Sequence, residues 1–101
     1  MDENRHFFRI RNTGRICAKV AENTVEILDI SATGVLIKHH NLLPKHGILE
    51  LKVHNFSMNI SYDILRAEEN SMVLVFNKEE ERDKLFLVLR NLRNEQNKKS
   101  Q

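Results

Sequence analysis

The fold class of this chain is decided by Phe56-Ser57-Met58-Asn59-Ile60-Ser61-Tyr62-Asp63-Ile64, the clearest run of alternating side chains in the sequence. Large apolar residues stand at every second position, and polar residues stand between them. A period of two is typical of a β-strand that turns one face to a protein core and the other to water. The run therefore predicts a long, half-buried strand in the middle of the chain.

Shorter segments of the same character lie on both sides of this run. The links between them are as short as hairpin turns, for example Glu22-Asn23 and His54-Asn55. Such spacing favours an antiparallel sheet that curls or closes into a barrel, because closure removes the exposed strand edges. The six predicted strands cover residues 15–20, 24–30, 35–39, 48–53, 56–65 and 72–76.

The period changes near the end of the chain, where apolar residues recur at the i, i+3, i+4, i+7 spacing of an amphipathic helix. This stripe consists of Leu85, Val88, Leu89 and Leu92. Asn77 can cap such a helix, with Glu80 as its reciprocal partner three residues later. We therefore predict a C-terminal helix over 77–96 and a frayed polar tail over 97–101.

The composition is that of a single small globular domain. The chain has 101 residues, of which 41% are apolar and 30% are charged, which excludes a mostly disordered or collagen-like chain. The single Cys17 cannot form an internal disulfide, which favours a reducing compartment. We find no secretory signal, and the longest apolar run, Leu85–Leu89, is too short to span a bilayer. We therefore expect a cytoplasmic protein without membrane insertion.

The positive charge of the chain is concentrated near its start. Residues 1–20 carry five basic and two acidic side chains, whereas residues 21–101 carry eleven basic and twelve acidic ones. Residues 1–14 also lack a clear period, so we expect a flexible arm before a barrel at 15–76. A local excess of basic residues is consistent with an anionic partner or with a solvated face, and charge alone does not choose between them.

Two short motifs carry candidate binding chemistry. Arg5 and Arg9 stand four positions apart in the basic arm, and a guanidinium can grip a phosphate or a guanine edge through two hydrogen bonds. Asp29, Ser31 and Gly34 stand where one predicted strand ends and the next begins. They offer an acceptor, a hydroxyl and a residue that allows close approach to the backbone. The same three residues would also serve as an ordinary turn between strands.

Taken in this order, the residues resemble the motifs of the PilZ domain family, whose members are bacterial receptors for cyclic di-GMP. That family carries RxxxR near the N-terminus and [D/N]xSxxG about twenty residues later. Arg5, Arg9, Asp29, Ser31 and Gly34 match every defined position. The resemblance implies an all-β fold with one helix, namely a six-stranded antiparallel β-barrel followed by a C-terminal α-helix.

The resemblance also implies how the protein works. Cyclic di-GMP would be its ligand, with no other cofactor, and ordering of the arm would relay binding to a downstream protein partner. The two motif arginines would hold phosphates or guanines, while the aspartate and serine would meet a guanine edge or brace an arginine. Asn4 and His6 are secondary candidates. Arg11 and Arg15 repeat the arginine spacing but lie too near Asp29 to match the family, so we expect an accessory or solvated role for them.

Other chemistries are disfavoured. No cysteine or carboxylate stands at a recognisable metal-ligand spacing, and His39 and His40 are adjacent on a predicted strand, so we expect no metal site. Ser31 lacks the flanking glycines of a nucleophile elbow, so we expect no enzyme. A nucleotide-independent adaptor of the same fold remains an alternative. A barrel that binds single-stranded nucleic acid is a further one, although 6% aromatic residues and no Trp make a poor stacking surface.

Overall fold

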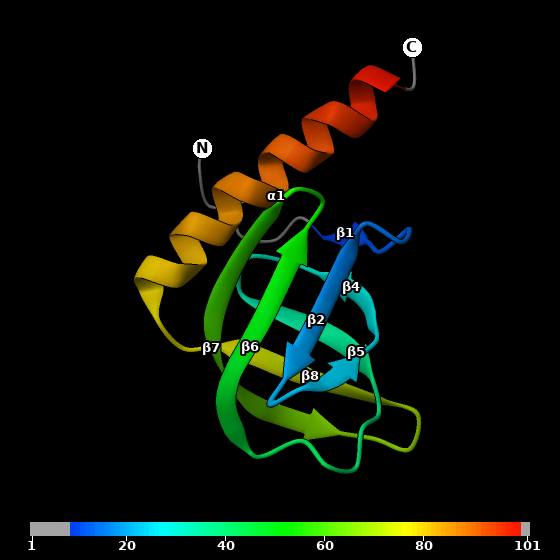
Figure 1. Ribbon diagram of the computed structural model, residues 1–101, viewed down its shortest axis with the longest axis vertical. Coiled ribbons are helices and arrows are strands. Elements are labelled where there is room, and N and C mark those ends of the chain that lie inside the picture. The colour runs from blue at the N-terminus through cyan, green and yellow to red at the C-terminus, as the bar shows by residue number, and fades with distance from the viewer. Residues whose placement is uncertain (1–8, 100–101) are drawn as a thin grey trace.

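The computed structural model describes residues 9–99, and within them the chain forms eight strands followed by one helix (Figure 1). The mostly β architecture with a C-terminal helix is confirmed, but the predicted number of six strands is wrong. The elements are β1 (Ile10–Arg11), β2 (Ile16–Val20), β3 (Asn23–Val25), β4 (Ile27–Ile30), β5 (Gly34–Lys38), β6 (His46–Val53), β7 (Phe56–Ala67), β8 (Ser71–Phe76) and α1 (Glu79–Lys99).

All eight strands belong to one antiparallel sheet in the order β1-β4-β5-β8-β7-β6-β2-β3. The sheet curls strongly, so that β2 and β4, which lie near its opposite ends, come into contact. Figure 1 shows the result as an open barrel with α1 running diagonally across one end. The curl buries one face of the sheet and leaves the other face outside.

The predicted strand over 24–30 is two strands in the structure. Its first half, β3, pairs with β2, and its second half, β4, pairs with β5 and β1. The change of partners falls at Glu26, whose carbonyl accepts a hydrogen bond from the Lys38 N–H (2.9 Å). Val25 and Ile27 on either side are both buried. An alternating pattern reports which residues face the core, but it does not encode which neighbour a strand pairs with.

The additional strand β1 lies within the segment expected to be an arm. Ile10 is only 5% exposed and pairs with Ile30, and the Asn12 N–H donates to the Leu28 carbonyl (3.0 Å). A strand of two residues is too short for periodicity to reveal. Residues 1–8 lie outside the described residues, so the remainder of the expected arm stays a prediction.

The turn between β2 and β3 lies at Ala21-Glu22, one residue earlier than the expected Glu22-Asn23. Both turn residues have positive φ, 49° at Ala21 and 74° at Glu22. This is the backbone of a two-residue hairpin turn that matches the twist of its strands and that normally carries Asn or Gly. Here two residues with a Cβ adopt it, which is energetically unfavourable.

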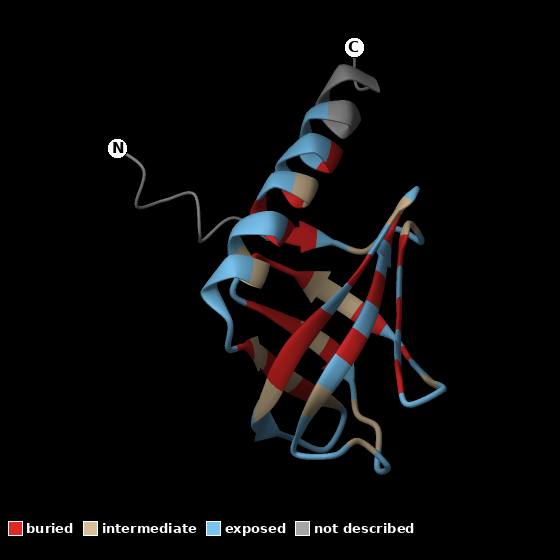
Figure 2. Cartoon of the chain, turned by 60° about the vertical axis from the view of Figure 1, so that its left-hand side comes forward, coloured by how far each residue is buried: buried red, intermediate tan, exposed pale blue. Residues whose placement is uncertain are grey.

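The core fills the inside of the curl and is covered by α1. Figure 2 shows buried residues in bands along the strands and on the side of α1 that faces them. The Tyr62 hydroxyl within this core donates to the Pro44 carbonyl (2.9 Å), and burial raises the pKa of the Tyr62 phenol above its ordinary value. The largest fully buried side chains are Tyr62, Phe76, Ile30, Ile37, Leu49, Leu51, Ile60, Leu74, Leu85, Leu89 and Val35.

The helix begins at Glu79, and the preceding Asn77 bonds to β7 through its donor groups. Its side-chain amide donates to Asp63 Oδ2 (2.8 Å) and its backbone N–H donates to the Ser61 carbonyl (3.3 Å). Glu81 Oε1 accepts the Ser61 N–H (2.8 Å). The first turn of α1 therefore continues the hydrogen bonding of β7 past the point where β8 ends.

The far end of α1 reaches Lys99, so it includes part of the expected tail at 97–101. Within residues 9–99, the helix is not apolar enough to cross a membrane.

Candidate functional site

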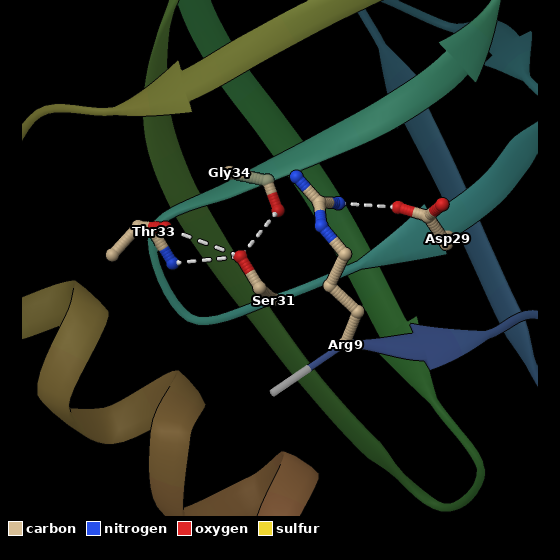
Figure 3. A network of polar contacts seen from close by, with 5 residues as sticks. All are labelled: Arg9, Asp29, Ser31, Thr33 and Gly34. Carbon is tan, nitrogen blue, oxygen red and sulfur yellow. Dashed lines mark hydrogen bonds and ion pairs between the residues drawn. The ribbon is translucent and has the colours of Figure 1, made fainter. Parts of the chain in front are cut away.

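The two sequence motifs meet on the outer face of the sheet, where β1 pairs with β4. Arg9 stands immediately before β1 and Asp29 lies on β4. Arg9 Nη1 donates to Asp29 Oδ1 (2.5 Å), and the two side chains are 55% and 29% exposed, respectively. Figure 3 shows the Arg9 side chain reaching over the β4–β5 hairpin to Asp29. An ion pair at the surface thus joins residues twenty positions apart in sequence.

The position of this ion pair follows from the β1–β4 register. Ile10 pairs with Ile30, and both side chains are buried in the core. Because side chains alternate along a strand, the neighbours of Ile10 and Ile30 are directed to the outer face. Arg9 and Asp29 therefore emerge on the same side of the sheet.

Asn12 holds this part of the sheet together, a role that the sequence reasoning missed. Its Nδ2 donates to the carbonyls of Ile16 (2.9 Å) and Ile27 (3.0 Å), which joins β2 to β4. Its Oδ1 accepts the N–H groups of Gly14 (2.9 Å) and Ile16 (3.2 Å). In sequence, the only signal is an Asn-Thr-Gly triplet, which indicates a turn and nothing about a bridge between strands.

Ser31 is buried, with 3% exposure, and its hydroxyl is used within the turn between β4 and β5. The hydroxyl accepts the Thr33 N–H (3.3 Å) and lies 3.2 Å from the Thr33 hydroxyl and 3.4 Å from the Gly34 carbonyl (Figure 3). The Ser31 N–H donates to the same carbonyl (2.9 Å). Thr33, which the motif does not define, is exposed.

Gly34 is required by the packing of the sheet. A Cβ at this position would lie 2.6 Å from the backbone carbonyl oxygen of Leu74 on β8. Its φ is not positive, since Gly14 is the positive-φ glycine of the described chain. Within the described chain, the close approach that Gly34 permits is between β5 and β8.

The structure thus brings four of the five motif residues together: Arg9 and Asp29 as an ion pair, and Ser31 and Gly34 in the neighbouring turn. Arg5 lies outside the described residues, as do the secondary candidates Asn4 and His6. Their expected roles in binding remain predictions.

The four placed residues form an open surface instead of a cavity. The two main hollows of the described chain lie elsewhere. One of about 280 Å³ lies between the β6–β7 turn and α1, and one of about 480 Å³ lies over the outer face of β2, β3, β6 and β7. Among residues 9–99, no group of three or more His, Cys, Asp or Glu side chains could hold a metal ion.

Known proteins resemble this chain in sequence and in fold. The sequence model of the PilZ-like family, described as PilZ domain-like, matches residues 9–97. The chain is also similar to an uncharacterized Legionella protein, Lpg0364, known from a crystal structure. The two are 44% identical with a TM-score of 0.87, and the match covers 90% of this chain and 99% of that one. None of the curated proteins compared with the chain matches it.

Proposed function

Because the chain belongs to the PilZ-like domain family, we propose that it is a bacterial, cytoplasmic receptor that binds cyclic di-GMP and relays this second messenger to a protein partner. Domains of this family act as receptors and adaptors, and we propose no enzymatic activity. The observation that carries the proposal is the Arg9–Asp29 ion pair, which couples the N-terminal segment to the [D/N]xSxxG turn on the surface.

The chemistry of this pair suits a ligand that carries both phosphate and guanine. Arg9 donates hydrogen bonds from a planar fork that fits a phosphate or the O6/N7 edge of guanine. Asp29 accepts hydrogen bonds, as the N–H groups on the Watson–Crick edge of guanine require. Without ligand the two side chains satisfy each other, and a cyclic diguanylate offers each of them a new partner.

The relay is proposed to involve the N-terminal residues. Arg5 would close over the bound nucleotide together with Arg9, and the covered nucleotide would present a changed surface to the partner. Coupling of ligand binding to ordering of a segment gives a switch, because the ligand stabilises one surface over the other. This step concerns residues outside those that the structure describes.

Isothermal titration calorimetry with cyclic di-GMP tests the proposal, with cyclic di-AMP and 5′-GMP as comparison ligands. We expect Arg9→Ala and Asp29→Ala each to weaken binding by about 10-fold to 150-fold, since a lost charge-assisted hydrogen bond costs about 1.5–3 kcal/mol. Thermal stability should change little, because exposed ion pairs contribute at most about 1 kcal/mol. Lys52→Ala, an exposed residue of β6, is the matched control.

Two outcomes would count against the receptor. If the folded wild-type protein does not bind at tens of micromolar cyclic di-GMP, the proposal is wrong. If Arg9→Ala and Asp29→Ala unfold the protein, the ion pair serves the fold and gives no support to a ligand site.

A nucleotide-independent adaptor is the second candidate, and one observation favours it. The Ser31 hydroxyl and the Gly34 backbone are both accounted for by contacts within the fold. The [D/N]xSxxG residues would therefore be needed even without a ligand. A partner that copurifies with the protein and binds with the same affinity with and without cyclic di-GMP would support this candidate.

A further inference from the structure

Arg11 lies directly across the sheet from Asp29. The β1–β4 register pairs these two residues, and Arg11 is exposed. The Cβ atoms of directly opposed residues in an antiparallel pair are about 4.5–5.5 Å apart. Ile10 and Ile30, the other pair of this ladder, face the core. The Arg11 side chain therefore starts beside Asp29 on the same outer face as Arg9.

Arg11 is not neutralised by a described acid. None of the ion pairs found among the described side chains includes Arg11. Asp29 is the acid nearest to Arg11 along the ladder, and Arg9 already binds it. Among the described side chains, the Arg11 guanidinium is thus a cation without an acidic partner at this place on the surface.

The charge of the site makes this cation relevant. A cyclic dinucleotide carries two phosphodiester charges, whereas Arg9 and Asp29 together have a net charge of zero. With Arg11 included, the described part of the site has a net charge of +1. An anion placed over β1 and β4 would gain from Arg11 an attraction that the Arg9–Asp29 pair alone does not supply.

The strands beyond Asp29 carry apolar side chains on this part of the sheet. On the other side of Asp29, the register places Leu36 of β5, which is half-buried, and Val73 of β8 follows it. Gly34, two residues before Leu36, has no side chain. Figure 3 places the Arg9 guanidinium above this region, between Gly34 and Asp29. The outer face beyond Asp29 is therefore partly apolar, as the face of a base prefers.

We propose that Arg11 is a further ligand-binding residue of this site and that its guanidinium binds a phosphate of the cyclic dinucleotide. This inference rests on the proposed function. It is not contained in the sequence motifs, because Arg11 has the wrong spacing for them, and only the strand register brings it to Asp29.

The test compares Arg11→Gln, Arg11→Lys and the control Lys52→Ala by calorimetry with cyclic di-GMP at low and high salt. Arg11→Gln keeps much of the side chain but loses the charge, and we expect roughly tenfold weaker binding or more, with a smaller dependence on salt. Arg11→Lys keeps the positive charge but loses the planar guanidinium that donates two hydrogen bonds to one phosphate. Its affinity should therefore lie between those of Arg11→Gln and the wild type. Lys52→Ala should bind like the wild type.

The outcomes separate this inference from the proposed function. If both Arg11 variants bind like the wild type while Arg9→Ala does not, the inference is overturned and the receptor stands. If both variants lose affinity equally and also melt at a lower temperature, Arg11 acts through the fold and the inference is overturned as well. If the folded wild-type protein does not bind cyclic di-GMP, the receptor and the inference fall together.

Discussion

Replacing Gly34 with alanine should destabilise the protein whether or not a ligand binds near it. The added Cβ would lie 2.6 Å from the Leu74 carbonyl oxygen, closer than real Cβ contacts, which stay above 3.0 Å. The obstacle is backbone, which cannot rotate away as a side chain can. Gly34 pairs with Val75 and Val35 pairs with Leu74, so relief of the contact must move β5 and β8 apart in the middle of the sheet.

The size of the effect can be worked from this geometry. Insertion of a methyl group into a packed region costs about 1–3 kcal/mol. In a domain of this size, each 1 kcal/mol shifts the melting temperature by about 4–8 °C. A cost of about 2 kcal/mol would therefore lower the melting temperature of Gly34→Ala by about 8–16 °C.

Thermal and urea unfolding of Gly34→Ala, followed by circular dichroism, measure this cost directly. Gly47→Ala is the matched control, since it also adds one methyl group to a strand glycine. Its Cβ would lie 3.4 Å from the Tyr62 ring, an ordinary contact, so its stability should stay within about 1 kcal/mol of the wild type or rise slightly. If Gly34→Ala proves as stable as the wild type and loses only ligand affinity, then the glycine serves the ligand and the packing argument is refuted.

Three further predictions concern other parts of the fold. Replacing Ala21-Glu22 with Asn-Gly should raise the free energy of unfolding by about 1–2 kcal/mol, because the turn requires positive φ at both positions; an unchanged urea midpoint would contradict this. Glu81→Ala should lower the free energy of unfolding by about 1–3 kcal/mol and speed hydrogen exchange at the Ser61 amide, because this amide loses its acceptor. Burial raises the Tyr62 pKa, so the unfolded chain releases this proton first and stability should fall as pH rises above about 10. Tyr62→Phe should lose less stability than the wild type above about pH 10, and an equal loss in both proteins would show that the Tyr62 phenol is not responsible.

Much of the fold could be predicted from the sequence because the residues that face the core recur at a regular spacing along each strand and along the helix. The run over 56–65 became β7, and the leucine stripe became the buried side of α1. Neither the division of the predicted strand 24–30 at Glu26 nor the strand β1 was predicted, because both depend on which strands lie beside them in space. The expected start at Asn77 also differs from the structure, where α1 begins at Glu79 and Asn77 donates hydrogen bonds to Asp63 and Ser61.

The sequence named the residues of the candidate site, but it did not show how the fold arranges and holds them. The motifs named Arg9 and Asp29, and the structure places them in contact. The sequence could not show that the Ser31 hydroxyl is used by its own turn, or that Gly34 lies against Leu74. From the sequence, Arg11 had only an accessory or solvated role, and the strand register is what places it opposite Asp29.

The change of pairing partners at Glu26 also indicates how the barrel can assemble. It joins two local hairpins, β2–β3 and β4–β5, into one unit, while β6, β7 and β8 form a second unit of local hairpins. The two units meet along two seams, β2 with β6 and β5 with β8. Each seam joins residues distant in sequence, and once one seam has closed, the second is brought near at a smaller cost in chain entropy. Docking of two preformed halves along paired seams would make folding cooperative, with the Asp29 strand in the half that comes first in the sequence.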